Sequence, residues 1–222
     1  MAFYQSIEIK PKTNLYLWKI TEDFTTLFRQ VQLKDVSLAR VESMKSESHQ
    51  KGFLAVRMLL QHLGYSDFDL YYDDLGKPHL SRKSQIACQK PDETHISISH
   101  SNCFSGILIS DQNVGLDIEQ LKQKTLKIAS RFMDILHLEN LSEAEQIQKA
   151  TVIWGIKETV FKIKNEVGIS FPDHISETPF AFEDKITTAK LVFYNQTDYF
   201  ETVFDSVEDY IYVCGFLTTK KL

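Results

Sequence analysis

Glycine, proline and cysteine are scarce in this chain of 222 residues, which contains 8 Gly, 5 Pro and 3 Cys. This composition excludes a collagen-like or low-complexity chain. Hydrophobic residues make up 43% of the sequence and charged residues 25%, which is ordinary for a folded globular protein. The length is sufficient for one large domain or two small ones.

The sequence also lacks the features of a secreted or membrane protein. Residues 1–12 contain no apolar stretch of the kind that a secretion signal carries. The longest strongly apolar run, residues 53–60, is about a third of a membrane span and includes Arg57. The cysteines are odd in number and have no C-x-x-C spacing, which favours neither a disulfide framework nor a zinc site: Cys88, Cys103 and Cys214. We therefore expect a cytoplasmic protein that does not bind membranes.

Positive charge is in deficit, with a formal net charge of -5 and a pI near 5.8. This balance argues against general binding of nucleic acid or anionic lipid. Four common catalytic motifs are missing, namely G-x-S-x-G, H-E-x-x-H, G-x-G-x-x-G and G-x-x-x-x-G-K-[ST]. A serine hydrolase, a zincin, a Rossmann enzyme and a P-loop NTPase therefore lose support.

Hydrophobic periodicity predicts an α+β fold. Helices are expected where apolar residues recur at spacings of three and four, over residues 23–30, 46–63, 126–133 and 142–164. The last of these opens with Ser142-x-x-Glu145, the spacing of a capping box. Strands are expected over residues 4–9, 14–20, 68–72, 95–99, 104–110, 114–119, 186–194, 199–204 and 210–217.

The order of these elements predicts two halves, residues 1–111 and residues 112–222. Each half contains one long helix and several strands, so we expect two similar α+β halves. Residues 82–93 and 165–179 are polar, contain proline and are expected to be loops.

Two carboxylates lie in the sequence Gly115-Leu116-Asp117-Ile118-Glu119. The strand period of two places Asp117 and Glu119 on one face, about 7 Å apart along the strand. Paired carboxylates suit a hard cation such as Mg²⁺, which completes its coordination with water and phosphate oxygens. The alternative is an ordinary half-exposed strand with its polar residues outward.

A second candidate motif is Trp154-Gly155-Ile156-Lys157-Glu158-Thr159-Val160-Phe161-Lys162. Helical spacing places Trp154, Glu158 and Lys162 along one side. Glu158 is a candidate metal ligand or general base, and Lys162 a candidate partner for a phosphate oxygen. The alternative is a solvated Glu-Lys pair.

Two further motifs are weaker. His100 ends the predicted strand that carries Ile96 and Ile98 on the same face. It is either a satisfied core histidine or a ligand-binding residue beside the Ser99 hydroxyl. Gly76-Lys77-Pro78 is a tight turn with one cation.

Together and in this order, GKP at 76–78, SISHS at 97–101, GLDIE at 115–119 and WGIKETVFK at 154–162 resemble the motif series of 4'-phosphopantetheinyl transferases. The resemblance is greatest to the longer, surfactin-synthetase-activating (Sfp-like) type and covers residues 57–171 well. It implies a pseudo-dimeric monomer with coenzyme A between two similar halves. It further implies transfer of the 4'-phosphopantetheine arm to a serine of an apo acyl or peptidyl carrier protein, with release of adenosine 3',5'-bisphosphate.

The resemblance also implies roles for single residues. Asp117, Glu119 and Glu158 would hold Mg²⁺, or Mn²⁺ in its place, against the pyrophosphate of coenzyme A. Lys157 and Lys162 would stabilise phosphate charge. Glu158 would also take the serine proton.

At the other end of coenzyme A, Lys77 and Pro78 would line the adenine and ribose. Ser99 and His100 would contact the phosphates, with His100 at the 3'-phosphate and among the catalytic residues.

The chain departs from the family where an arginine usually helps to bind the 3'-phosphate, just before the apolar part of the first long helix. Lys51 or Arg57 would take that role here.

Carrier proteins are generally acidic, so docking requires a local basic patch on this acidic chain. A candidate patch, or else an ordinary amphipathic helix, is formed by Lys122, Lys124, Lys127 and Arg131. Two alternatives to a transferase stay open, namely a non-catalytic module that binds coenzyme A or a carrier protein, and a Mg²⁺-dependent phosphohydrolase.

Overall fold

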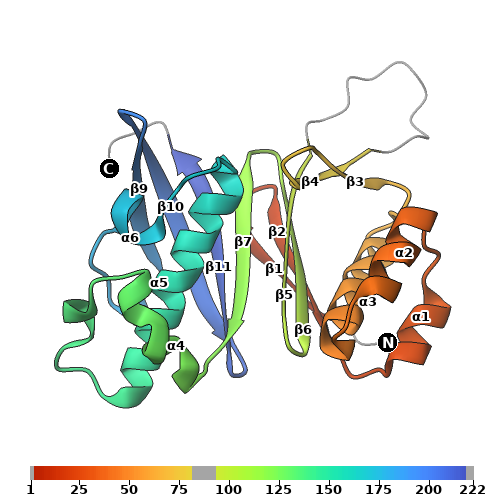
Figure 1. The fold of residues 1–222 in the computed structure, drawn as a ribbon, viewed down its shortest axis with the longest axis horizontal. Helices are drawn as coiled ribbons and strands as arrows, with labels where there is room; N and C mark the ends of the chain where they lie inside the picture. The colour runs from red at the N-terminus through yellow and green to blue at the C-terminus, as the bar shows by residue number, and fades with distance from the viewer. Residues whose placement is uncertain (1–2, 82–93, 219–222) are drawn as a thin grey trace. The chain divides into compact units, whose positions relative to one another are not determined.

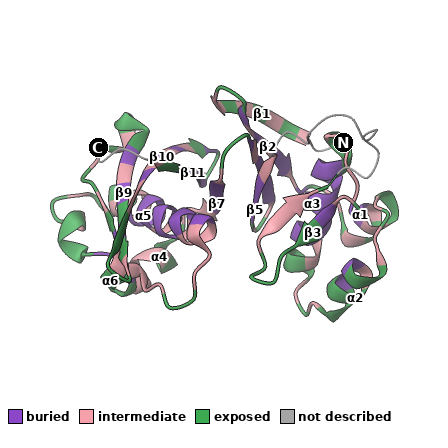
Figure 2. Cartoon of the chain, turned by 90° about the horizontal axis from the view of Figure 1, so that it is seen from above, coloured by how far each residue is buried: buried purple, intermediate pink, exposed green. Residues whose placement is uncertain are grey.

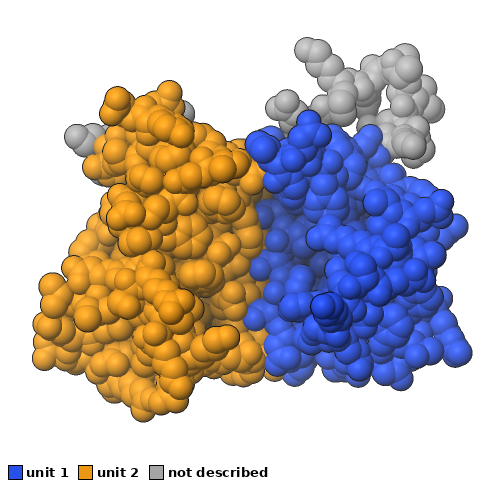
Figure 3. Space-filling model, viewed as in Figure 1, with its two compact units in different colours: residues 1–112 blue, residues 113–222 orange. Residues whose placement is uncertain are grey.

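The structure is a computed structural model that describes residues 3–81 and 94–218. It divides into two compact units, residues 1–112 and residues 113–222, which Figure 3 shows in blue and orange. Each unit contains an antiparallel sheet and one long helix (Figure 1). The expected loop at 82–93 and Cys88 lie outside the described residues.

Within residues 3–81 and 94–112, unit 1 begins with a hairpin, continues through three helices and ends with four strands. Its sheet has the strand order β1-β2-β6-β5-β4-β3. Its elements are β1 (Phe3–Lys10), β2 (Thr13–Lys19), α1 (Phe24–Gln30), α2 (Asp35–Ser43), α3 (Glu47–His62), β3 (Leu70–Tyr72), β4 (Pro78–Leu80), β5 (His95–Ser101) and β6 (Phe104–Ser110).

Helix α3 forms the centre of the unit 1 core. Its first turn is capped by the Ser46 hydroxyl, which accepts a hydrogen bond from the backbone N–H of His49 at 3.4 Å. Every residue from 52 to 60 is buried, and the helix packs against β2, β5 and β6. Leu54 and Leu59 are fully buried, and each such side chain contributes about 1.5–3 kcal/mol.

Over residues 113–218, unit 2 contains one strand, several short helical segments, the longest helix that the structure describes, and four further strands. Its sheet has the strand order β7-β11-β10-β9-β8. Its elements are β7 (Val114–Gln120), α4 (Gln123–Ile128), η1 (Ala129–Arg131), η2 (Ile135–Leu138), α5 (Glu143–Lys164), α6 (Phe171–His174), β8 (Ile175–Glu177), η3 (Phe182–Asp184), β9 (Ile186–Phe193), β10 (Gln196–Val207) and β11 (Tyr210–Thr218).

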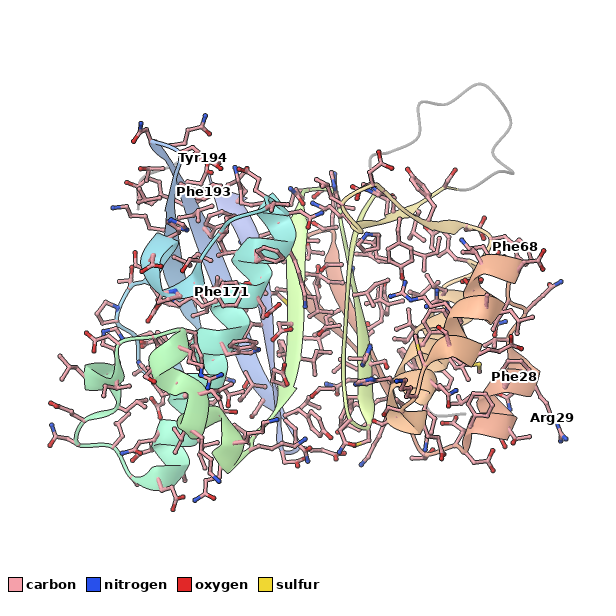
Figure 4. All side chains as sticks on the ribbon, viewed as in Figure 1. Phe28, Arg29, Phe68, Phe171, Phe193 and Tyr194 are labelled. Carbon is pink, nitrogen blue, oxygen red and sulfur yellow. The ribbon has the colours of Figure 1, made fainter. Side chains whose placement is uncertain are left out.

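Helix α5 lies on this second sheet and is buried along much of its length (Figure 2). The predicted capping box is present, because the Ser142 hydroxyl accepts from the Glu145 N–H and the Glu145 carboxylate accepts from the Ser142 N–H. Val152, Ile156 and Val160 pack with apolar side chains of the sheet. Phe171, labelled beside the helix in Figure 4, makes edge contacts with Trp154 and Phe161.

The two units have the same topology once β1 is set aside. In unit 1 the order is β2-β6-β5-β4-β3, and in unit 2 it is β7-β11-β10-β9-β8. In both, a first strand leads to the long helix, and the last of four following strands pairs with that first strand. The predicted α+β fold with two similar halves is therefore confirmed.

Most predicted elements match the structure to within a few residues, and the strand at 104–110 coincides with β6. The single helix predicted over 126–133 is wrong, because α4 ends at Ile128 and a 3₁₀ turn follows. The predicted loop at 165–179 is wrong in part, since it contains α6 and β8. No helix within residues 3–81 and 94–218 has the length and apolar character needed to cross a membrane.

Candidate functional site

Two glycines bring α5 unusually close to the neighbouring strands of unit 2. A Cβ atom at Gly115 on β7 would lie 2.4 Å from the backbone oxygen of Thr159 on α5. A Cβ atom at Gly155 on α5 would lie 2.5 Å from Cγ2 of Val213 on β11 and 3.7 Å from Oδ2 of Asp117. No side chain fits at these positions, so the motif glycines allow helix and strand to touch.

This close approach places Lys162 of α5 against Asp117 of β7. The Lys162 ammonium donates to Oδ1 of Asp117 at 2.9 Å and to the Leu116 carbonyl oxygen at 2.7 Å. Asp117 is only 4% exposed. The Asp117 side chain thus faces α5 and not the solvent.

Glu158 belongs to the same group of charges. Burial raises the pKa of its carboxyl above the usual range, the negative charge of Asp117 raises it further, and Lys162 opposes the shift. Two carboxylates and one ammonium therefore interact where α5 meets β7. A raised pKa in a polar cluster is typical of functional sites.

Glu119 lies further along β7 and lines a groove of about 270 Å³. The groove also contacts Trp154 on α5 and the basic residues Lys122 and Lys124 before and within α4. Among residues 3–81 and 94–218, no three His, Cys, Asp or Glu side chains come together closely enough to form a metal site.

The chemistry of the donors nevertheless fits a hard divalent cation. Asp117, Glu119 and Glu158 offer oxygen ligands alone, the type that Mg²⁺ and Mn²⁺ prefer. The charge of Asp117 already opposes ionisation of Glu158. A bound cation would relieve that repulsion.

Lys157 of α5 lies in a different environment from Lys162. It is 2% exposed, and its ammonium lies 2.7 Å from Oε2 of Glu177 and donates to the Ile175 carbonyl oxygen. No ammonium surface is left to meet a phosphate. This placement argues against the phosphate contact predicted for Lys157.

In unit 1, His100 packs against the N-terminal part of α3. A Cβ atom at Gly52 would lie 2.9 Å from its Nδ1, and its ring lies 6.0 Å from that of His49. His100 itself is exposed, whereas Ser99 is 8% exposed. His100 is therefore not a buried core histidine, and it lies next to the turn of α3 that carries Lys51.

Lys77 and Pro78 follow a tight turn between β3 and β4. Gly76 has a φ of 81°, which glycine adopts without strain. The Asp73 carboxylate organises this turn, accepting from the N–H groups of Leu75 and Lys77 and contacting the ring of His79 at 3.0 Å. Burial lowers the pKa of Lys77, and Asp73 opposes that shift.

Arg57 lies inside unit 1 and is 3% exposed. Its Nε donates to Oδ1 of Asp67 at 2.9 Å, and its guanidinium lies 3.4 Å from the ring centroid of Phe53. No exposed guanidinium edge is left for a phosphate. Of the two predicted anchors for the 3'-phosphate, this placement argues against Arg57 and favours the half-buried Lys51.

Comparisons with known proteins agree with these motifs. No known family profile matches the chain. It is 28% identical over 138 residues to the 4'-phosphopantetheinyl transferase Sfp of Bacillus subtilis, which covers 58% of this chain and 57% of that protein. It is 32% identical over 73 residues to the 4'-phosphopantetheinyl transferase gsp of Aneurinibacillus migulanus, covering 32% of this chain and 31% of that protein.

This chain is similar to the 4'-phosphopantetheinyl transferases. The resemblance inferred from the four motifs, including its Sfp-like type, is confirmed by these two relatives. The chain spans about half the length, or less, of the curated relatives it matches.

Some residues that contact these motifs were not predicted from the sequence. Asp73 could have been found, because an Asp three residues before a glycine is a common turn signal. His49 lacks such a signal, since its approach to His100 depends on how α3 packs on β5. Glu177 lies in what the sequence predicted to be a loop.

Proposed function

We propose that this chain transfers the 4'-phosphopantetheine arm of coenzyme A to a serine of an apo acyl or peptidyl carrier protein, in a reaction that depends on Mg²⁺ or Mn²⁺. The observation that carries the proposal is the meeting of Asp117, Glu158 and Lys162 where α5 touches β7. The similarity to two phosphopantetheinyl transferases supports it. A cytoplasmic, monomeric enzyme is expected from the sequence and stays a prediction.

Asp117, Glu119 and Glu158 are the residues that would hold the metal ion. When bound, such an ion neutralises charge on a pyrophosphate and on the phosphoryl group in transfer. Lys162 supplies a second positive charge beside the same carboxylates. This combination of cation and carboxylates suits phosphoryl transfer.

In the proposed step, the serine hydroxyl oxygen attacks the β-phosphorus of coenzyme A. A new P–O bond forms, and the bond to the oxygen that bridges the two phosphates breaks. Adenosine 3',5'-bisphosphate leaves with that electron pair, and Lys162 offsets the charge that it gains. Glu158 takes the serine proton, a role that a positioned carboxylate can fill.

Unit 1 supplies the candidate contacts for the adenosine end of coenzyme A. Lys77 and Pro78 follow a turn that Asp73 holds in shape, as a binding loop requires. Ser99, His100 and Lys51 are proposed to meet phosphate oxygens, because His100 lies against the part of α3 that carries Lys51.

The Glu158→Gln variant tests the proposed role of Glu158 in transfer, as metal ligand and base together. We expect coenzyme A affinity within about twofold of wild type and a transfer rate about 100-fold lower, because a positioned base typically contributes that much. Isothermal titration measures the affinity, and mass spectrometry of the carrier protein measures the rate. Near-normal turnover would remove Glu158 from this role.

The proposed docking surface for the carrier protein is the basic patch formed by Lys122, Lys124, Lys127 and Arg131. All four side chains are exposed, and Ile135 and Leu136, which follow closely, are 56% and 62% exposed. Basic and apolar groups together fit an acidic amphipathic partner.

Charge reversal tests this surface. Lys124→Glu with Lys127→Glu should raise the KM for the carrier protein about tenfold and spare coenzyme A affinity. Lys45→Glu with Lys190→Glu changes the net charge equally at two exposed sites elsewhere and serves as the control. Equal effects of the two double variants would indicate general electrostatics instead of a docking surface.

The two alternatives predict different outcomes in the same assay. A binding module would bind coenzyme A and transfer nothing. A Mg²⁺-dependent phosphohydrolase would release adenosine 3',5'-bisphosphate without any carrier protein. The meeting of Glu158, Asp117 and Lys162 favours the transferase over the binding module.

A further inference from the structure

A buried carboxylate that the proposed mechanism does not use lies on β8. The Glu177 side chain is 4% exposed. Its Oε2 lies 2.7 Å from the Lys157 ammonium, and its Oε1 lies 3.3 Å from Nδ1 of His137 on η2. Glu177 is thus an ionic partner of the long helix that carries Glu158.

Glu177 compensates for burial of positive charge. Lys157 is 2% exposed and could not remain charged there without an anion, because an isolated buried ion is very costly. Lys149, about two turns before it on α5, is partly buried. Burial lowers the pKa of Lys149, and Glu177 and Asp184 oppose the shift. The ion pair of Lys157 with Glu177 is therefore required by this packing.

The position of Glu177 in the sheet gives the ion pair a mechanical role. In the described part of the unit 2 sheet, β8 and β7 are the two edge strands. Helix α5 is tied to β8 through Lys157 and to β7 through Lys162 and Asp117. Each residue advances about 100° around a helix, so the two lysines point about 140° apart.

Glu158 lies between these two attachments. It follows Lys157 directly and precedes Lys162 by four residues, which places it about 40° from Lys162 around the helix. Loss of one attachment would let α5 rotate or shift on the sheet. Such a movement would carry the Glu158 carboxylate away from Asp117.

Unit 1 contains a comparable ion pair between its long helix and its sheet. The proposed metal-binding carboxylates are not part of this unit. Arg57 on the long helix α3 pairs with Asp67 at 2.9 Å, and Asp67 lies just before the edge strand β3. Both side chains are buried, as are those of Lys157 and Glu177. This second pair provides a matched comparison, because α3 carries no ligand of the proposed metal site.

We infer that Glu177 is a positioning residue of the proposed active site. Through its ion pair with Lys157, Glu177 holds α5 where the Glu158 carboxylate meets Asp117. The inference rests on the proposed function. It assigns to Lys157 an anchoring role in place of a phosphate contact.

The test compares Glu177→Gln with Asp67→Asn, each of which leaves one buried cation without its anion. Urea unfolding measures stability, titration with Mn²⁺ in the presence and absence of coenzyme A measures metal affinity, and carrier mass spectrometry gives kcat and KM. We expect both variants to lose stability. Only Glu177→Gln should weaken Mn²⁺ affinity about tenfold and lower kcat about tenfold, with the KM for coenzyme A within about twofold.

A second variant keeps the test decisive if Glu177→Gln does not fold. Lys157→Met with Glu177→Leu removes both charges at similar volume, a change that often preserves stability. This double variant should fold and still bind Mn²⁺ less tightly, because the attachment to β8 is lost. Exposed Glu183→Gln is the control for the chemical change and should match wild type.

Two results would overturn the inference, namely wild-type Mn²⁺ affinity and kcat in the folded Glu177 variants, or equal losses in Asp67→Asn. A wild-type protein that binds Mn²⁺ but transfers nothing would refute the proposed function alone, because Mn²⁺ affinity would still decide the role of Glu177. A wild-type protein that does not bind Mn²⁺ in either condition would overturn the inference as well.

Discussion

The contact between Gly115 and α5 leads to a quantitative prediction for the Gly115→Ala variant. The added methyl group would lie 2.4 Å from the Thr159 carbonyl oxygen, 2.9 Å from its Cα and 3.0 Å from its carbonyl carbon. All three are backbone atoms in the interior of a helix, so no side chain can rotate to make room. Helix α5 must instead move away from β7.

Overpacking of this kind costs about 1–3 kcal/mol, which corresponds to a fall in Tm of several degrees for a chain of this size. The displacement would also separate Glu158 from Asp117. We therefore expect the free energy of unfolding to fall by about 2 kcal/mol and Mn²⁺ affinity to fall about tenfold. Urea titration and Mn²⁺ titration measure the two effects.

Gly52→Ala is the matched control. Its methyl group would meet the ring of His100 at 2.9 Å, and that ring is exposed and can rotate away. Because Gly52 lies within α3, alanine also gains about 1 kcal/mol of helix propensity. Stability should stay close to wild type. Wild-type stability and Mn²⁺ affinity in Gly115→Ala would refute the claim that this glycine sets the distance between helix and strand.

Two further predictions concern α5. Because burial and Asp117 raise the pKa of Glu158 in the folded protein, the free energy of unfolding should fall as the pH rises from the ordinary glutamate pKa to the raised one. Metal-free Glu158→Gln should therefore be more stable than wild type at neutral pH. Below both the ordinary and the raised glutamate pKa, the two proteins should be equally stable. Urea titrations across pH measure the difference, and no gain in stability at neutral pH would contradict this reasoning. Ser142→Ala removes the capping box and should cost about 1 kcal/mol in the same assay, while Ser130→Ala at an exposed site should cost little; equal effects would show that the cap contributes nothing.

Strands and long helices were predictable from the sequence because their signals are local. Alternation of apolar and polar residues identified β1, β2 and β7, and a capping serine marked the start of α5. Helix α2 was missed because only Ser37 and Val41 of its nine residues are buried, which leaves almost no apolar period. The three-residue strands β4 and β8 are too short to show alternation.

The charged residues were harder to place, because their environment depends on distant partners. In the sequence, Lys157 looks like an exposed cation within its motif, and Arg57 looks like an isolated cation in an apolar run. Each is buried because a carboxylate 10 or 20 residues further along the chain, Asp67 or Glu177, reaches the same helix. Sequence spacing did predict that Glu158 and Lys162 share a side of α5, and the structure adds that Asp117 faces them.

Intact-protein mass spectrometry of apo carrier proteins tests the central claim most directly. The purified chain is incubated with coenzyme A, Mg²⁺ and a panel of carrier proteins, with EDTA as the control. The proposed function predicts that at least one carrier gains the mass of a single phosphopantetheine arm only when the metal is present. Measurable binding of coenzyme A with no mass gain on any carrier would contradict it.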